Sequence, residues 1–109
     1  MATKTVQIVS LTGLTPAYTA CTVGGDEFVN SGREFIHVKN GHTSPQTVTV
    51  NSQAACDQGA DHDIAVSVIN AEERMIGPFP KARFDDAAGK VQLTYSGVTA
   101  LTIAVVRLP

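Results

Sequence analysis

Residues 33–40 read Arg-Glu-Phe-Ile-His-Val-Lys-Asn, and residues 46–51 read Gln-Thr-Val-Thr-Val-Asn. Both segments alternate apolar and polar side chains with a period of two, and both are rich in β-branched residues, which is the pattern of half-buried β-strands. Asn40-Gly41 starts a turn between them because both residues tolerate a positive φ, and Pro45 closes it. The two segments therefore predict a β-hairpin with a loop of intermediate length.

The same alternation recurs along the chain, whereas no stretch shows a convincing helical period of 3.6. The further predicted strands, separated by glycine, proline and polar turn residues, cover residues 5–10, 18–23, 27–30, 62–70, 74–80, 90–96 and 100–108. Eight or nine short strands predict an all-β fold, an antiparallel β-sandwich with the jelly roll as one option. The 109 residues fit a single domain, because no repeat or linker divides them.

Some segments also carry signals about their position. The last strand, 100–108, is apolar on both faces near its end, which favours a central place in a sheet. Pro78 and Pro80 cannot donate to a strand ladder, so 74–80 is expected at a sheet edge or leaving the sheet. Residues 85–89 predict a polar loop or one helical turn.

The first sixteen residues predict an extended arm. Residues 1–16 hold a strand followed by a connector that Gly13 and Pro16 interrupt. Such a segment can pair with the sheet edge of a neighbouring subunit. Val6 and Ile8, the apolar residues of the strand, are therefore candidate interface residues. A strand hydrogen-bonded within its own subunit would contradict this hypothesis.

The charge balance excludes some classes of partner. Only 17% of the residues are charged, the net charge is −2, and the eight basic residues are scattered from Lys4 to Arg107 without a cluster. We therefore expect no nucleic-acid partner. No apolar run could span a bilayer, and no signal region follows Met1, so we expect no membrane partner. Cys21 and Cys56 are then expected as free, buried thiols, with a disulfide as the alternative.

The sequence offers no clear reaction centre. The densest group of potential metal ligands consists of Cys56, Asp57, Asp61, His62 and Asp63. Its spacing matches neither a zinc motif nor an EF-hand loop, even with His37 or His42 added, so no metal is expected. A nucleophile elbow and a thiol-protease signature are absent, and acidic residues follow Gly24-Gly25, where a phosphate would be repelled. We expect neither enzymatic activity nor a cofactor.

Two further features predict contact surfaces. If Ile36 and Val38 face the core, the opposite face of that strand carries Arg33, Phe35, His37 and Lys39. An exposed aromatic ring beside basic groups could form an interface, although a loop of the same domain could equally cover Phe35. Phe79, between two prolines, admits the same pair of interpretations. Its ring could be presented rigidly to a partner, because the prolines lower the entropic cost of binding, or it could cap the edge of the core.

Several strings together resemble a known group of proteins. They are residues 28–33 leading into 35–40, residues 75–80 (Met-Ile-Gly-Pro-Phe-Pro) with Phe84-Asp85 downstream, and residues 91–95 with 105–107. In general pattern, from about Thr5 onward, the chain is similar to short proteins encoded in the structural gene clusters of tailed bacteriophages and prophages. None of the strings is a diagnostic motif, so no binding residue carries over from the group.

The resemblance implies a capsid decoration (cement) protein, bound across capsomer junctions and oligomeric on the shell, that stabilises the expanded head against internal DNA pressure. Its partners would be the major capsid protein and copies of itself. Its place would be the capsid surface of the virion, after synthesis in the cytoplasm of the host bacterium. A head–tail connector, a tail subunit and a small ligand-binding β-sandwich are the alternatives. The absence of Trp and the presence of only two Tyr disfavour carbohydrate binding.

Overall fold

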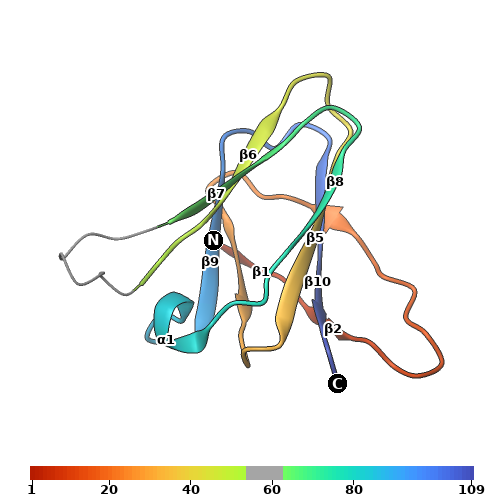
Figure 1. The fold of residues 1–109 in the computed structure, drawn as a ribbon. Helices are drawn as coiled ribbons and strands as arrows, with labels where there is room; N and C mark the ends of the chain where they lie inside the picture. The colour runs from red at the N-terminus through yellow and green to blue at the C-terminus, as the bar shows by residue number, and fades with distance from the viewer. Residues whose placement is uncertain (54–62) are drawn as a thin grey trace.

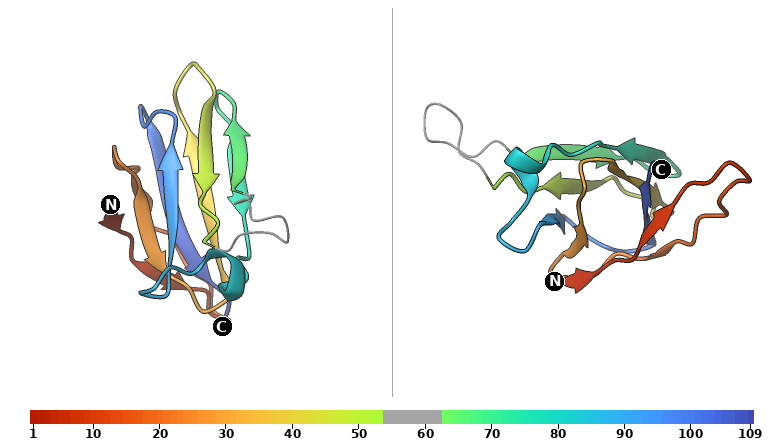
Figure 2. Two further views of the ribbon diagram at one scale, coloured as in Figure 1. Left: turned by 90° about the vertical axis from the view of Figure 1, so that its left-hand side faces the viewer. Right: turned by 90° about the horizontal axis from the view of Figure 1, so that it is seen from below.

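Two β-sheets form the protein, and the computed structural model describes residues 1–53 and 63–109 (Figures 1 and 2). Sheet A contains, in spatial order, β1 (Ala2–Thr3), β4 (Asp26–Val29), β9 (Lys90–Tyr95), β6 (Gln46–Val50) and β7 (Ile64–Val68). Sheet B contains β2 (Val6–Ile8), β10 (Leu101–Arg107), β5 (Glu34–Asn40) and β8 (Glu73–Ile76), and β3 (Thr19–Ala20) also pairs with β10. The prediction of an all-β sandwich is confirmed.

The chain passes repeatedly from one sheet to the other. From β4 onward, only β6 and β7 are consecutive strands within one sheet. If β3 to β10 are counted as strands one to eight, sheet A reads 2-7-4-5 and sheet B reads 1-8-3-6, the strand order of a jelly roll. β1 and β2 are additions to this order, and they pair in parallel with β4 and β10. The sheets are therefore mixed, not purely antiparallel as the sequence predicted.

Apolar residues from the facing sides of the two sheets fill the core. On β5, Ile36 and Val38 are completely buried, and on β6 so are Val48 and Val50. The alternating pattern that identified these strands thus gives their inner faces correctly, because successive side chains of a strand point to opposite sides. The core also takes both aromatic and aliphatic residues from β4, β9 and β10, including Phe28, Val91, Leu93, Leu101, Ile103 and Val105.

The predicted hairpin between residues 33–40 and 46–51 is wrong. β5 pairs with β10 and β8 in sheet B, whereas β6 pairs with β7 and β9 in sheet A. β7 and β8 likewise follow each other in the chain but lie in different sheets. Alternation shows that one face of a strand is buried, but it does not say whether the next strand lies beside it or across the core.

The positional predictions for the C-terminal half fare better. β10 is an inner strand of sheet B, and its apolar residues are buried on both faces, Ala104 and Val106 included. β8 lies at the edge of sheet B and ends at Ile76, before the two prolines. The helical turn comes earlier than predicted: α1 spans Lys81–Phe84 and starts directly after Pro80.

The first eight residues do not extend as an arm. In β1, the residues Ala2 and Thr3 pair with β4 of sheet A, and the Lys4 amide donates to the Glu27 carbonyl at 2.8 Å. In β2, Val6 and Ile8 pair with β10 of sheet B. The strand is hydrogen-bonded within its own subunit, which contradicts the arm hypothesis. The parallel pairing was not recognisable, because so short a strand leaves many partners open.

Asn40 joins the connections at the end of the sandwich that lies uppermost in Figure 1. Its side chain is only 2% exposed. The amide nitrogen donates to the carbonyls of Ser44 (3.0 Å) and Val68 (2.8 Å). The amide oxygen accepts from the His42 backbone N–H (2.9 Å) and from Gln46 Nε2 (3.0 Å). Each hydrogen-bonding position of this buried amide is therefore satisfied.

Neighbouring bonds extend this junction to two more connections. The backbone of Asn40 bonds with Glu72 and Ala71, in the link between β7 and β8. Gln46 Nε2 also donates to the Thr99 carbonyl at 2.8 Å, in the link between β9 and β10. Three of the connections that pass between the sheets at this end, β5–β6, β7–β8 and β9–β10, therefore meet at one pair of buried amides.

Replacing Asn40 should destabilise the whole fold. We expect Asn40→Ala to lower the free energy of unfolding by about 2–4 kcal/mol, because several buried polar groups would lose their partner at once. Urea denaturation followed by circular dichroism measures this change. The exposed Asn70 offers a matched control, and Asn70→Ala should stay within about 0.5 kcal/mol of the wild type. Similar effects of the two changes would contradict a central role for Asn40.

Candidate functional site

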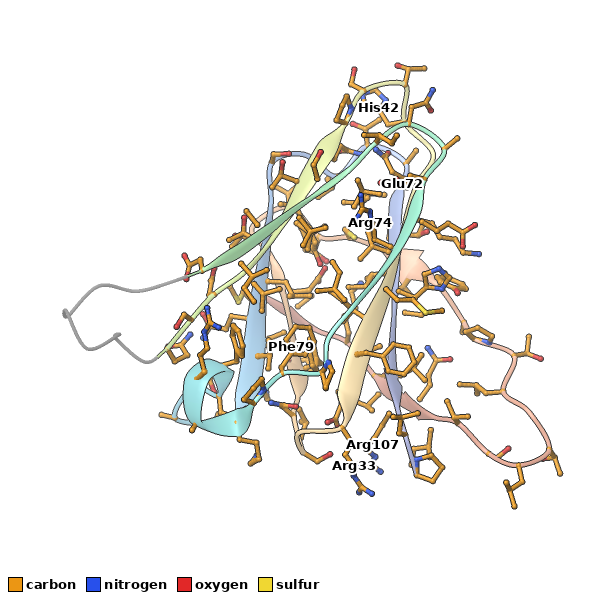
Figure 3. The ribbon with its side chains drawn as sticks, viewed as in Figure 1. Arg33, His42, Glu72, Arg74, Phe79 and Arg107 are labelled. Atoms are coloured by element: carbon orange, nitrogen blue, oxygen red, sulfur yellow. The ribbon has the colours of Figure 1, made fainter. Side chains whose placement is uncertain are left out.

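The outer face of sheet B carries the residues that the sequence analysis placed on one stripe. Phe35, His37 and Lys39 are half-buried on the side of β5 that faces away from sheet A, and Arg33 is exposed just before the strand. Figure 3 shows Arg33 at the lower end of the sandwich, near Arg107 of β10. The alternation of β5 thus brings four of the candidate interface residues onto the same face.

A polar network occupies the upper part of this face. The Tyr18 hydroxyl lies 2.5 Å from His37 Nδ1, and His37 Nε2 lies 2.9 Å from the Glu73 carboxylate. Because a carboxylate can only accept, Nε2 donates to it, and in the neutral ring Nδ1 accepts from Tyr18. Lys39 Nζ lies 4.0 Å from the centre of the Tyr18 ring. His37 and Lys39 are thus engaged within the chain, where they hold Tyr18 against β5.

An apolar groove occupies the lower part of the same face. It has a volume of about 300 Å³ and is lined by Arg33, Phe35, Met75, Ile76, Gly77, Pro78 and Leu108. Met75 is 69% exposed and Leu108 is 52% exposed. Gly77 lies directly on Phe35: a Cβ there would be 2.9 Å from the Phe35 Cβ, so only glycine lets the end of β8 pack this closely. We name this feature the Phe35–Met75 groove.

The connector between β2 and β3 lies next to the groove and projects from the sandwich (Figures 1 and 2). At its base, Gln7 and Ala17 exchange two hydrogen bonds, from Gln7 Nε2 to the Ala17 carbonyl (2.9 Å) and from the Ala17 N–H to Gln7 Oε1 (2.8 Å). At its tip, Ser10 accepts from the Gly13 N–H at 3.0 Å through its carbonyl. Leu11 in this turn is fully exposed. We name residues 9–17 the projecting loop.

A smaller cavity of about 170 Å³ connects the loop with the groove. It lies between Leu14, Pro16 and Tyr18 of the connector and Phe35, His37 and Met75 of the sheet. Phe35 and Met75 line both hollows. The connector therefore covers only one side of Phe35, and the other side opens into the groove. The interpretation that a loop of the same domain covers Phe35 is therefore correct for one side of the ring, and a role of Phe35 in an interface stays a prediction.

The remaining candidate interface residues do not join this face. Val6 is half-buried and packs against the core, and Ile8 is 49% exposed at the edge of sheet B. Sequence reasoning in turn missed Leu11, Met75 and Leu108. The sequence did contain one indication of an apolar segment around Leu11, because no charged residue occurs between Lys4 and Asp26.

Phe79 is not a surface residue. It is 1% exposed, and its ring packs between Phe28 and Phe84 with centroid distances of 5.7 Å to each. Figure 3 shows the ring turned into the sandwich. The interpretation that Phe79 is presented to a partner is therefore wrong, and the alternative, that it closes the edge of the core, is correct.

A buried polar cluster lies at the other edge of the sandwich. Asp26 is fully buried, and its Oδ2 accepts from the Tyr95 hydroxyl (2.7 Å) and the Thr22 N–H (3.1 Å). Lys4 Nζ lies 3.8 Å from the Asp26 Oδ1. Burial, together with the Asp26 charge, raises the pKa of the nearby Cys21 thiol to about 11. Cys21 is a free cysteine that stays protonated at neutral pH, so it is not a nucleophile.

Metal-binding geometry is not seen in the part of the chain that is described. Within residues 1–53 and 63–109, no three His, Cys, Asp or Glu side chains gather as a set of ligands. Of the cluster named from the sequence, Cys56, Asp57, Asp61 and His62 lie outside the described residues, whereas the Asp63 carboxylate accepts from the Ser52 N–H at 2.7 Å. Over the same residues, no helix has the length and apolar character to cross a membrane.

Comparison of the chain with protein-family models, with curated proteins and with solved structures gives no match. The fold and the candidate surface therefore have to be interpreted from the residues themselves.

We predict that Phe79 contributes to stability and not to partner binding. Phe79→Ala should lower the free energy of unfolding by about 3–5 kcal/mol, because it leaves a cavity between two other rings. Phe35→Ala on the outer face is the matched control, and its cost in a urea titration should be clearly smaller. An equal cost for the two changes would contradict this assignment.

Glu34 gives the fold a predictable response to acid. Its side chain is fully buried, and burial alone would raise its pKa. Its Oε1 accepts from the Ser31 N–H (2.7 Å), the Ser31 hydroxyl (2.8 Å) and the Arg33 N–H (3.1 Å). These bonds outweigh burial and hold the pKa of Glu34 below its ordinary value of 4.5. The stability they provide is therefore complete above pH 4.5 and is lost as the pH falls through the lower pKa of the folded state.

The Glu34→Gln variant tests this pH dependence. At pH 7 it should be about 1–2 kcal/mol less stable than the wild type, because it replaces charge-assisted hydrogen bonds by neutral ones. The difference should shrink as the pH falls below 4.5. Urea titrations of both proteins at pH 7 and pH 3 measure it, and a difference that does not change with pH would contradict the role of the Glu34 charge.

Proposed function

We propose that this protein is a virion structural protein that binds the outside of a phage capsid and stabilises the shell through surface contacts and self-association. The observation that carries the proposal is the concentration of exposed apolar side chains on one side of sheet B. Met75 and Leu108 line the Phe35–Met75 groove there and are more than half exposed, and Leu11 is fully exposed in the adjoining projecting loop. Large apolar side chains gathered in this way mark a surface that is covered by another macromolecule.

The architecture supports a role in contact rather than in catalysis. Near the groove, the imidazole of His37 is bonded on one side to Tyr18 and on the other side to Glu73. The Cys21 thiol is buried and stays protonated. The lower part of the outer face of sheet B is an apolar groove, which suits binding to a protein partner. The resemblance to phage structural proteins supplies the identity of that partner, the major capsid protein.

Such a protein would stabilise a shell by simple mass action. A protein that binds the assembled, expanded shell and not the dissociated subunits stabilises the shell by an amount that grows with its concentration over Kd. Each copy needs only to contact two neighbouring capsomers and to stay folded under load. A jelly roll whose crossing connections are tied together at Asn40 is a stiff body of this kind.

Binding to shells tests the proposal directly. Purified protein is added to undecorated expanded capsids of the parent phage, which are then pelleted and imaged. We expect many copies per shell at regular positions and a higher temperature of shell disruption. Unexpanded shells and an unrelated β-sandwich of similar size are the controls. Shells without bound protein would contradict the proposal, and a few copies confined to one vertex would indicate a connector instead.

A further inference from the structure

The projecting loop is a preformed apolar protrusion. Gln7 and Ala17 close its base with two hydrogen bonds, and the Ser10–Gly13 turn shapes its tip. Ser10 Oγ adds contacts to Thr12 Oγ1 (3.2 Å) and to the Gly13 carbonyl (3.1 Å). Leu11 points away from the protein and buries none of its side chain. A loop ordered by its own bonds loses little entropy when its leucine is inserted elsewhere.

The Phe35–Met75 groove has the size and chemistry to accept such a side chain. Its volume of about 300 Å³ exceeds that of one leucine side chain, and its walls are an aromatic ring, a thioether and aliphatic groups. Met75 can adjust to an inserted group because its side chain is unbranched and flexible. Within residues 1–53 and 63–109, the Arg33 guanidinium at the rim forms no ion pair, and it can donate to backbone carbonyls of an incoming loop.

We propose that the projecting loop of one copy inserts Leu11 into the Phe35–Met75 groove of a second copy. The inference deepens the self-association that is part of the proposed function, and it rests on that function only for its biological setting. The contact joins two different patches of the same chain. When each copy inserts its loop into the groove of the other, the contact is made twice and forms a two-fold symmetric pair.

Two features favour a second copy over an unrelated partner. The loop carries no charge, since no charged residue occurs between Lys4 and Asp26. Among the described residues, Arg33 is the one charged residue that lines the groove. The two patches therefore match in polarity. They also adjoin each other, since Phe35 and Met75 line both the groove and the cavity beneath Leu14 and Pro16. One association can thus cover the loop and the groove of each copy together.

Sedimentation velocity of the full chain over a range of concentrations, without any capsid, tests the contact. We expect the wild type to self-associate, and Leu11→Ser and Met75→Ser each to weaken association about tenfold to a hundredfold, the equivalent of removing one buried apolar side chain. Val23→Ser is the matched control, because Val23 is 82% exposed on a different loop, and it should leave association unchanged. Circular dichroism establishes that every variant is folded.

A charge pair separates this contact from a general loss of apolar surface. L11K and M75E should each be monomeric when alone. Mixing them should restore association, because the lysine of one variant meets the glutamate of the other while the unchanged loop and groove also match. A mixture that stays monomeric would overturn the proposed contact, as would a wild type that remains monomeric or a Val23→Ser variant that is equally impaired.

The outcome is distinguishable from that of the capsid experiment. A wild type that associates through Leu11 but leaves shells bare would support this contact and contradict the proposed function. A wild type that is monomeric at every concentration, with Leu11→Ser failing to bind shells, would overturn this contact. In that case the loop would serve the capsid protein and not a second copy.

Discussion

The fold depends on a single buried amide at the point where the chain crosses between the sheets. Asn40 ends β5, and its four side-chain hydrogen bonds reach the β5–β6 connection and β7. Gln46, its neighbour, reaches the β9–β10 connection. In a jelly roll most consecutive strands lie in opposite sheets, so backbone bonds between neighbours in sequence cannot hold the connections in place. Buried side-chain amides hold the connections instead. Because an unpaired buried amide costs free energy, this one arrangement of the connections is favoured over others.

The edge of the sandwich formed by β1 and β2 is closed in a different way. The first eight residues give β1 to sheet A and β2 to sheet B, so one short segment spans both layers. Between the two strands, Lys4 Nζ donates to Thr19 Oγ1 (3.0 Å) and to the Ala20 carbonyl (2.7 Å) and approaches the buried Asp26. Because β2 and β3 both pair with β10, the chain between them has to leave the sheet and return. The projecting loop is thus a consequence of how this edge is closed.

Period-two patterning was sufficient to predict the longer strands and their buried faces, as the buried Ile36 and Val38 of β5 show, but it gave neither the two-residue β1 nor the pairing of the strands. The pairing of β5 with β10 joins residues about 65 apart in sequence, and no local signal encodes it. Phe79 was ambiguous because two prolines restrict the backbone equally whether a ring points inward or outward. Met75 looked like an ordinary strand residue, and only its place on the edge strand β8 leaves it exposed. The absence of charge around Leu11 was visible in the sequence. That residues 9–17 project from the sandwich follows from the tertiary structure alone.

The outer face of sheet B combines two halves that depend on each other. In the upper half, Tyr18 is held by His37 and Lys39, which fixes the end of the connector against β5. That anchor, with the Gln7–Ala17 bonds, determines where the connector leaves the sheet and therefore where Leu11 stands. In the lower half, Phe35 and Met75 remain open toward the groove because the anchored connector covers them on one side only. The polar side chains of the upper half thus form their hydrogen bonds and ion pairs within the chain, and the apolar side chains of the lower half stay exposed. Such preorganisation lets a small surface bind with little loss of entropy.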